Sequence, residues 1–425
     1  MDEVHNLLPF IFSPHSRNQK IAKDYIQSLY DGVLKKRVSL EPLRWKNVLL
    51  LFSGLEISTN ELAIVEQIYN ETKAREPATE GSKHELVWIP IVDTYSKSIE
   101  PKLKQFGNVR ESMPWYSVYH PSLIVNQVIS FIQREWKYKT KPILVVLDPL
   151  GRVSSSNAFH MTWIWGSNIA YPFTNSREQA LWQEENWRLE LLVNGDEISN
   201  WIKDEKYIFL YGGNESEWIS KFVKEARSVA EATKISLEML YVGKSSRRKQ
   251  VQNIVDIIKR EKLNTSFLQD QVMIRLFWTR VESMFFSKLQ LNQTNEEDQV
   301  MREIKKLLIY DKQSGWILLA RGSHIVVTGH ATTGLQTLED YENEWKEHGD
   351  KDGFEAAFKN HYAKLSSRAS PCSKFEVSAE IGETPEKLTC PECNRHMHVF
   401  TSIQCCHDGK IDEDFSVSTV TPPTI

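Results

Sequence analysis

The chain has 425 residues, of which 41% are hydrophobic and 25% are charged, and its formal net charge is -4. This length allows two or three domains with cores of their own, and the nearly balanced charge excludes a basic nucleic-acid-binding protein as a first hypothesis. The acidic start and the short apolar runs argue against a signal peptide and a membrane span. Four of the five cysteines lie within 390–406, which is not the spacing of a secreted disulfide framework, so we expect a soluble cytoplasmic protein.

The first predicted element is a helix over residues 16–37. Ile21, Tyr25, Leu29 and Leu34 recur at helical spacing and keep roughly to one face.

Residues 45–158 alternate between predicted strands and helices. The apolar run within 46–53 is typical of a strand that is buried on both faces. The predicted elements are strand 46–53, helix 60–73, strand 85–92, helix 128–136, strand 143–148 and a fourth strand after the turn at 149–152. Strands that alternate with helices predict a mostly parallel sheet covered on both faces, and therefore an α/β domain.

A tryptophan-rich segment follows at 159–200. Trp163, Trp165, Trp182 and Trp187 predict packed helices, and their indoles belong either to the core or to a contact between subunits. The next predicted elements are strand 206–211, helix 215–233, strand 237–242, helices 251–259, 268–290 and 296–309, a hairpin of strands 316–321 and 325–328, and two helices that end near residue 365. The repeated order predicts that 159–365 contains a second α/β domain, a degenerate copy of the first.

The C-terminal part of the chain has a different composition. Residues 366–388 are rich in Ser, Pro and Glu, which predicts a linker. A small cysteine- and histidine-rich module follows at 389–408, and we expect residues 409–425 to form a disordered tail.

Several features of the first domain resemble the nucleoredoxin and tryparedoxin branch of the thioredoxin superfamily. A strand ending in FSG, a second strand, the segment Met113–Trp115 (MPW) and Pro142 directly before a third strand follow one another in the family's order. The resemblance implies a thioredoxin-like domain in which Pro142 takes the place of a cis-proline. Family members open the first helix with Trp-Cys-x-x-Cys, because the helix N-terminus lowers the pKa of the attacking thiol. Here Leu55–Asn60 fills that place and no cysteine occurs before Cys372, which excludes disulfide exchange at this site.

A series of longer motifs is more specific than the fold. In chain order they are NVLLLFSGLEIS, HELVWIPIVD, MPWYSVYHP, KPILVVLDPLGRV, HMTWIWG, PFTNSREQALW, WRLELLV, YIFLYGG, EMLYVGKS, FWTRVESMFFSK, CPEC and CCH. Together, from residue 45 to residue 407, they closely resemble the sieve element occlusion family of plants. Members of that family extend further at the N-terminus, so the resemblance implies that residues 1–44 are the helical remnant of an additional N-terminal domain.

The resemblance implies a structural protein and not an enzyme. Family members form the filaments of P-protein in phloem sieve elements and help to plug the phloem after injury. We therefore expect a non-enzymatic subunit in the cytoplasm of sieve elements, with itself and other family members as partners in filaments and with no nucleic-acid partner. Some legume relatives build calcium-responsive bodies, which leaves a calcium response open.

The C-terminal module contains a candidate metal site. Cys390 and Cys393 form a C-x-x-C knuckle, which supplies two thiolates at one turn and suits tetrahedral zinc. Two of Cys405, Cys406 and His407 would complete the site, so we expect four of these five residues to bind a structural zinc. The alternatives are a regulatory or intermolecular disulfide, and reduced surface cysteines without a role.

An acidic segment only superficially resembles a calcium-binding loop. Asp350, Asp352 and Gly353 fit part of an EF-hand pattern, but the register places His348 at the first ligand position and Lys359 at the twelfth. The twelfth position requires a bidentate glutamate. An EF-hand is therefore excluded, whereas diffuse binding of calcium by carboxylates is not.

Two other functions compete with the structural one. The first is an oxidoreductase of the nucleoredoxin type, for which only Cys390 and Cys393 could supply the thiol pair. The second is an adaptor whose zinc-dependent C-terminal module binds a partner by itself.

Overall fold

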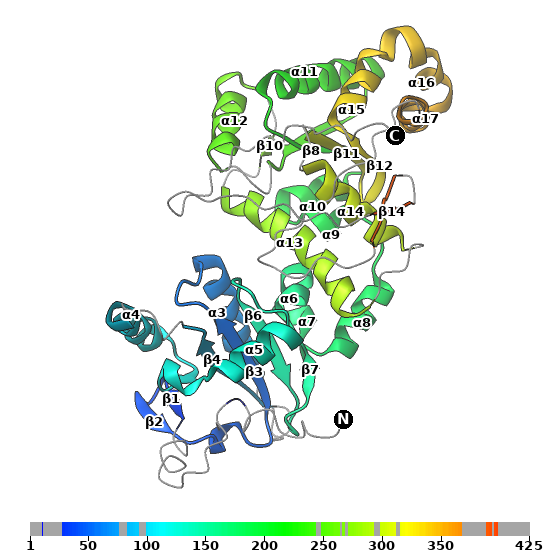
Figure 1. The fold of residues 1–425 in the computed structure, drawn as a ribbon. Coiled ribbons are helices and arrows are strands. Elements are labelled where there is room, and N and C mark those ends of the chain that lie inside the picture. Colours follow the sequence, from blue (N-terminus) through cyan, green and yellow to red (C-terminus); the bar gives the residue numbers. More distant parts are fainter. Residues whose placement is uncertain are drawn as a thin grey trace, which may run out of the picture. The chain divides into compact units, whose positions relative to one another are not determined.

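The computed structural model (Figure 1) describes residues 11, 28–75, 83–92, 99–243, 248–263, 266–267, 271–292, 298–311, 315–367, 388–392 and 395–397. The chain divides into two compact units. The first comprises Met1–Asn186, Glu282–Asn295 and Val377–Thr384, and the second comprises Trp187–Val281, Glu296–Glu376 and Pro385–Ile425. The tryptophan-rich segment therefore begins in the first unit and passes into the second at Trp187.

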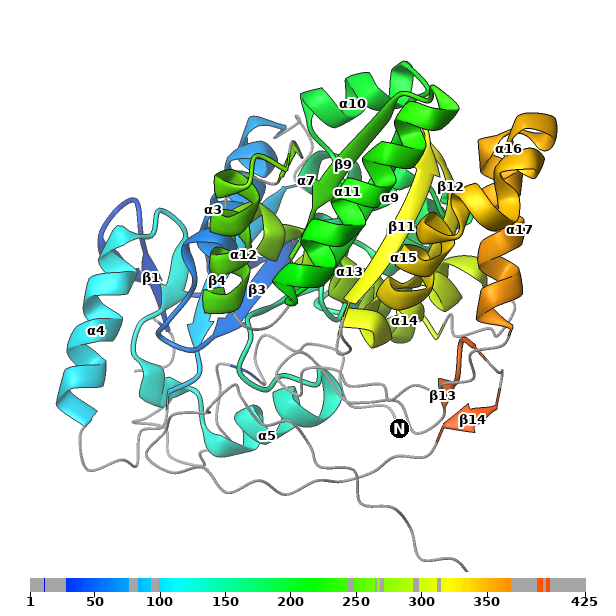
Figure 2. The same cartoon turned by 90° about the horizontal axis from the view of Figure 1, so that it is seen from above.

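The first unit contains a seven-stranded mixed sheet. Its elements are β1 (Leu29–Asp31), β2 (Lys36–Val38), η1 (Glu41–Leu43), β3 (Asn47–Ser53), α3 (Thr59–Ala74), β4 (His84–Pro90), α4 (Ile99–Ser112), β5 (Tyr116–Val118), η3 (Pro121–Leu123), α5 (Asn126–Glu135), β6 (Ile143–Leu147), β7 (Val153–Ser155), α6 (Phe159–Trp165), α7 (Ser167–Ala170) and α8 (Asn175–Glu184). The strand order is β2-β1-β5-β4-β3-β6-β7. Strands β3, β4 and β5 are parallel, whereas β6 is antiparallel to β3 and β7 to β6. Figures 1 and 2 show α3 and α5 on opposite faces of this sheet.

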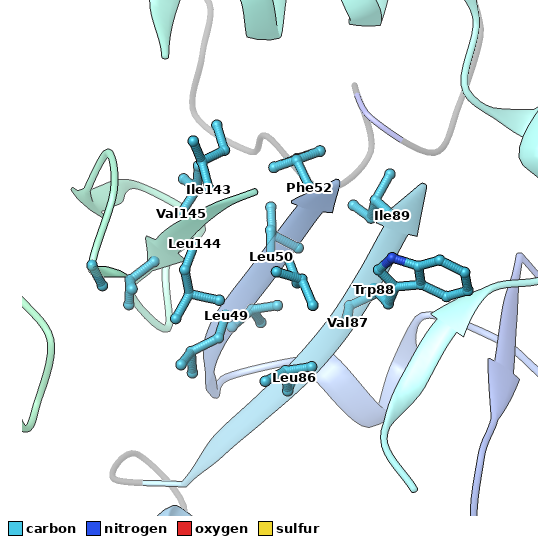
Figure 3. Packing of buried hydrophobic residues seen from close by; sticks show 14 of the residues in the cluster. Leu49, Leu50, Phe52, Leu86, Val87, Trp88, Ile89, Ile143, Leu144 and Val145 are labelled. Atoms are coloured by element: carbon cyan, nitrogen blue, oxygen red, sulfur yellow. The ribbon is translucent and has the colours of Figure 1, made fainter. Parts of the chain in front are cut away.

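The core of the first unit is centred on β3, β4 and β6 (Figure 3). Leu50 in β3 is paired with Val87 of β4 on one side and with Val145 of β6 on the other. The buried Trp88 indole donates a hydrogen bond from Nε1 to the Ser53 Oγ at 2.8 Å, so its polar group has a partner inside the core. The continuous apolar runs of these strands follow from helices covering both faces of the sheet. The residues labelled in Figure 3 are all 4% exposed or less: Leu49, Leu50, Phe52, Leu86, Val87, Trp88, Ile89, Ile143, Leu144 and Val145.

The second unit is built on a five-stranded sheet with the order β10-β9-β8-β11-β12. Its elements are α9 (Leu189–Leu192), α10 (Asp196–Lys203), β8 (Tyr207–Gly213), α11 (Ser216–Thr233), β9 (Leu237–Tyr241), α12 (Arg248–Arg260), β10 (Ser266–Phe267), α13 (Gln271–Gln290), α14 (Gln299–Asp311), β11 (Gly315–Arg321), β12 (His324–His330), α15 (Ala331–Glu339), the π-helix η4 (Tyr341–Trp345), α16 (Lys346–Asp352), α17 (Phe354–Ser366), β13 (Leu388–Thr389) and β14 (His396–Met397). Helices α11 and α15 contact each other on one face of the sheet, and α14 lies on the other (Figure 1). The part of α13 that follows Val281 belongs to the first unit.

The two sheets share one topology. Strands β7-β6-β3-β4-β5 and β12-β11-β8-β9-β10 occupy corresponding places and run in the same relative directions. In each unit a helix, α3 or α11, connects the first two parallel strands, and an antiparallel hairpin ends the sheet. This is the β-α-β-α-β-β order that the sequence predicts twice, so an α/β fold with a thioredoxin-like strand order in both units is confirmed.

The helix predicted over residues 16–37 is wrong where the structure describes this region. Leu29–Asp31 forms β1, which pairs with β5, and Lys36–Val38 forms β2. The Asp31 carboxylate accepts hydrogen bonds from the backbone N–H groups of Val33 and Leu34, at 2.9 and 2.8 Å. An aspartate side chain that bonds the following backbone competes with helix formation and favours a turn. Residues 29–38 are therefore part of the first sheet and not the end of a separate helical domain.

Two tryptophans of the tryptophan-rich segment form part of the core of the first unit. Trp182 is 5% exposed, and its ring meets the Trp165 ring edge to face at 4.8 Å. The Trp165 Nε1 donates to the Glu185 carboxylate at 3.0 Å. Trp163 is half-buried and packs against the same core. Of the two predicted roles, the structure assigns the core role to Trp165 and Trp182.

A buried polar network connects α8 with the last turns of α13 inside the first unit. The Trp182 Nε1 donates to the Ser287 Oγ at 2.7 Å, and the Ser287 hydroxyl donates to the Glu178 carboxylate at 2.5 Å. The Gln290 amide donates to the other Glu178 oxygen at 2.7 Å. Glu178 is fully buried, and this burial raises the pKa of its carboxyl to about 7, although the hydrogen bonds from Ser287 and Gln290 oppose the rise.

This network predicts a stability that depends on pH. Because the folded pKa of Glu178, about 7, exceeds its ordinary value of 4.5, the folded chain holds this proton more tightly than the unfolded chain does between these pH values. The contribution is fully present below pH 4.5 and is lost as the pH rises through 7, a loss of about 3 kcal/mol. We expect Glu178→Gln to remove this dependence and to be the more stable form above pH 7.

Urea unfolding at a series of pH values from 4 to 8 measures the effect. Glu184→Gln is the matched control, because Glu184 is an exposed residue of the same helix. The same pH dependence in all three proteins would contradict the prediction.

Candidate functional site

The first candidate site is the junction between β3 and α3, where a thioredoxin-like enzyme carries its cysteine pair. Ser58 is the N-cap of α3, and its Oγ accepts a hydrogen bond from the backbone N–H of Glu61 at 3.3 Å. The Glu61 carboxylate accepts one from the backbone N–H of Ser58 at 3.0 Å. This reciprocal capping box pairs two donors that a helix start otherwise leaves open. Ser58 and Glu61 are three residues apart, as the cysteines of a C-x-x-C pair are, but here they cap the N-terminus of α3.

Among the described residues of this junction, no side chain can exchange disulfides. Leu55 and Ile57 are partly buried and pack against the core. The Ser58 hydroxyl cannot replace a thiolate that attacks sulfur. The Glu61 carboxylate offsets the positive end of the helix dipole, which is the feature that lowers the pKa of a thiol in active enzymes. The arrangement stabilises a helix and offers no group for redox chemistry.

The MPW segment beside this junction is packed as a structural element. Met113 and Trp115 are each 2% exposed. The Trp115 ring lies 5.5 Å from the Tyr69 ring, and the Tyr69 hydroxyl donates to the Pro114 carbonyl at 3.3 Å. On the other side the chain at Gly32 approaches so closely that a Cβ there would collide with the carbonyl oxygens of Met113 and Trp115. The Met113 and Trp115 side chains of this segment are therefore buried, whereas Pro114 is exposed.

The proline that precedes β6 differs from what the resemblance implies. Among the described residues, the cis peptide bond is Tyr171-Pro172. The bond between Lys141 and Pro142 is trans, which is the lower-energy form of an X-Pro bond. The prediction of a cis-proline at position 142 is wrong.

The second candidate site is the C-terminal cysteine module. Leu388–Thr389 and His396–Met397 pair as an antiparallel hairpin. The backbone N–H of Cys390 donates to the Arg395 carbonyl at 2.9 Å, which continues the ladder, and Cys390 is a free thiol with 4% exposure. The hairpin thus brings the two ends of the segment after Cys390 together, which fits a knuckle that presents thiolates to one ion. The other predicted ligands lie outside the described residues: Cys393, Cys405, Cys406 and His407.

The hairpin is docked on α14 of the second unit. The Lys305 ammonium donates to the Thr389 carbonyl at 3.2 Å and approaches the Thr389 hydroxyl at 3.4 Å. The Tyr310 hydroxyl donates to the Glu392 carboxylate. Lys305, Thr389 and Cys390 are each less than 9% exposed, so this contact excludes water from both partners.

Tyr310 lies in a cluster of rings beneath the hairpin. Its ring centroid is 4.0 Å from that of His330, and the His330 backbone N–H donates to the Tyr362 hydroxyl at 3.1 Å. Burial and then the Glu392 carboxylate raise the pKa of the Tyr310 hydroxyl. Burial lowers the pKa of His330, and Glu392 opposes this shift. Both rings are therefore neutral at physiological pH, and Tyr310 acts as a hydrogen-bond donor.

Sequence reasoning missed the part of α14 that receives the hairpin. A signal was present for Lys305, because it follows Met301 by four residues and so falls on the apolar face of a helix, where a lysine is unusual. Tyr310 carries no comparable signal, since a tyrosine near the end of an amphipathic helix is ordinary.

The acidic segment near residue 350 is helical. Asp350 and Asp352 belong to α16, and α17 begins at Phe354, so the segment does not form a calcium-binding loop. Among the described helices, none is both long enough and apolar enough to cross a bilayer.

Comparison with known proteins identifies relatives across most of the chain. Residues 176–407 match the family model described as Sieve element occlusion C-terminus. The chain is 42% identical over 419 residues to Protein SIEVE ELEMENT OCCLUSION B of Arabidopsis thaliana, which covers 94% of this chain and 56% of that protein. It is 36% identical over 391 residues to Protein SIEVE ELEMENT OCCLUSION A of the same plant. That alignment covers 88% of this chain and 46% of the relative. The chain thus spans about half the length of the curated relatives it matches.

Solved structures with some similarity include tryparedoxins. Tryparedoxin II from C. fasciculata is 19% identical, covers 39% of this chain and 91% of its own, and has a TM-score of 0.28. Tryparedoxin I from Leishmania major is 14% identical and has a TM-score of 0.28. Its alignment covers 36% of this chain and 98% of the tryparedoxin chain. The thioredoxin-like assignment rests on the strand orders of the two sheets.

The capping box predicts how a thiol would behave at the start of α3. We expect the thiol introduced by Ser58→Cys to keep a pKa near the ordinary value of about 8.5, because the Glu61 carboxylate offsets the helix dipole. Adding Glu61→Gln should lower that pKa, since the dipole then acts alone. The pH dependence of alkylation, followed on the individual peptide by mass spectrometry, measures both values.

Gln67→Cys, at an exposed position in the middle of α3, is the reference thiol. Equal alkylation profiles with and without Glu61→Gln would show that the carboxylate has no such effect.

Proposed function

Because this chain belongs to the sieve element occlusion family, we propose that it is a non-enzymatic structural subunit of phloem protein filaments that self-associates and contributes to sieve-plate occlusion after wounding. The observation that carries the proposal is the family match over residues 176–407, together with 42% identity over 419 residues to a protein named for sieve element occlusion.

The geometry of the thioredoxin-like unit supports a role without catalysis. The junction that would hold a redox pair holds the Ser58–Glu61 capping box, and the neighbouring Trp115 is buried. A fold that usually carries a reaction can serve as a scaffold when the reactive groups are replaced. An oxidoreductase of the nucleoredoxin type is not favoured, because the remaining Cys390 lies in a hairpin far along the chain from the β3–α3 junction.

The partners of such a subunit are further copies of itself and other members of the family. Filaments require heterologous contacts, in which two different surfaces of one subunit meet and the symmetry does not close. The proposed location is the cytoplasm of sieve elements, in line with the phloem role that the names of the relatives imply.

A structural zinc ion in the C-terminal module is part of the proposal. Cys390, Cys393, Cys405, Cys406 and His407 supply five candidate ligands, of which four would hold the ion. Zinc would fix the turn that follows Cys390 and supply folding energy to a hairpin with two-residue strands. The docking of this hairpin on Lys305 and Tyr310 argues against a free adaptor module.

The first test is assembly. Purified, reduced protein should form ordered filaments in negative-stain electron microscopy as its concentration rises, because an open-ended contact adds subunits without limit. Parallel grids with and without calcium measure any calcium response. Dispersed particles at every concentration, with a monomeric mass in analytical ultracentrifugation both alone and with a longer relative, would refute the structural role.

The second test is metal content. The reduced protein should hold about one zinc ion per chain by elemental analysis, and Cys390→Ser should lower both the zinc content and the melting temperature. Cys372→Ser is the matched control, because Cys372 lies outside the module. A protein that is free of metal when purified under reducing conditions would remove the zinc site from the proposal.

A further inference from the structure

The C-terminal hairpin is a small element that is joined to the rest of its unit by a long connection. Helix α17 ends at Ser366 and the hairpin begins at Leu388, so 20 residues, 368–387, lie between the described segments. A chain of this length can span at most about 70 Å. Its length therefore does not restrict the hairpin to the α14 of its own chain.

The surface that receives the hairpin is a built site, which we call the cradle and define as Lys305 and Tyr310 of α14 with His330 behind them. Lys305 bonds the Thr389 backbone, and Tyr310 bonds the Glu392 side chain, so the cradle contacts the hairpin at the end of its first strand and within its turn. The Thr389 carbonyl is buried and finds its donor in Lys305, and a buried carbonyl without a donor is costly.

Every one of these contacts can be made in the same way by the hairpin of a second copy. Exchange of an identical element between copies needs no new interface, since the donor and the acceptor are already complementary. The cradle and the hairpin are different surfaces of one chain, so one-directional exchange leaves a free hairpin at one end of the assembly and a free cradle at the other. Such an assembly grows without closing.

The sheet edge that could otherwise support growth is capped at both of its ends among the described residues. Strand β12 is the longest edge strand, with seven residues. At its start the Leu189 backbone N–H donates to the Ser323 carbonyl at 3.0 Å, and at its end the His330 N–H is taken by the Tyr362 hydroxyl. A register shift interrupts its pairing with β11. Blocked ends and a bulge are the devices by which proteins prevent strand-to-strand association.

We propose that the C-terminal hairpin of one copy docks in the cradle of the next, and that this exchange links subunits into filaments. The inference rests on the proposed function and assigns a contact to it. Within one chain the hairpin competes at an effective concentration on the millimolar scale. The closed form therefore prevails in dilute solution, and exchange takes over as the protein becomes concentrated.

Two full-length variants test the exchange. Tyr310→Glu places a carboxylate against Glu392 and disables the cradle, and Glu392→Arg removes the carboxylate that accepts the Tyr310 hydrogen bond and disables the hairpin. Each variant alone loses the same hydrogen bond in its closed form and in its exchanged form, so it should assemble at about the concentration that the unmodified protein needs. An equimolar mixture should assemble at a roughly 10- to 100-fold lower concentration than either variant alone, because contacts between the two variants restore Tyr310 with Glu392 and also pair the new glutamate with the new arginine. Light scattering and negative-stain microscopy measure assembly.

Matched controls are Lys306→Glu on α14 and Glu347→Arg on α16, both charge reversals outside the cradle, which should assemble like the unmodified protein. Because Tyr310 is buried, circular dichroism must show that its variant is folded, and Tyr310→Phe, which loses only the hydroxyl, replaces it in the mixture with Glu392→Arg if it is not.

The possible results distinguish failure of the hairpin exchange from failure of the proposed structural role. If the unmodified protein forms filaments and the mixture assembles no more readily than either variant alone, the exchange is refuted and the structural role stands. If the unmodified protein stays monomeric with a longer relative present, the structural role fails, and association that appears only in the mixture would still support the exchange.

Discussion

Both units depend on one constraint, a central strand that is hydrogen-bonded on both sides and covered on both faces. In the first unit this strand is β3, between β4 and β6, and in the second it is β8, between β9 and β11. All backbone groups along its paired stretch can then find partners, and side chains pointing to either face must be apolar. The connections at the strand ends are not bound by this constraint. The same frame can therefore hold a redox pair or, as after Ser53, a capped helix start.

The two surfaces that invite a chemical interpretation are both used for packing. Hydrogen bonds of the capping box satisfy the start of α3 at the β3–α3 junction. The MPW segment beside it contacts the Tyr69 ring on one side and the backbone at Gly32 on the other. The cysteine hairpin lies against Lys305 and Tyr310 and not in open solvent.

The sequence was most informative where long apolar runs or amphipathic helices dictate the structure. Strands β3, β4, β6 and β8 and helices α3 and α5 lie within a few residues of their predicted bounds, because a strand buried on both faces is apolar throughout. Helix α4 (Ile99–Ser112) was not predicted. Residues 29–38 were misassigned because helical spacing of Leu29 and Leu34 does not reveal the turn that Asp31 and Gly32 form. Strand β5 has three residues, too few for an alternating pattern. The cradle depends on a contact between segments about 80 residues apart, as Lys305 and Thr389 are, which spacing along the chain cannot reveal.

The capping box has a consequence for what this fold can become. Ser58 and Glu61 hold the start of α3 through each other, so replacing either side chain alone removes one of the two hydrogen bonds and costs about 1 kcal/mol before any sulfur chemistry is possible. A single cysteine there has no partner to exchange with. The introduction of a redox pair at this junction therefore passes through a single-cysteine intermediate that is both less stable and inactive. The capping box thus disfavours, one substitution at a time, a cysteine pair at the start of α3.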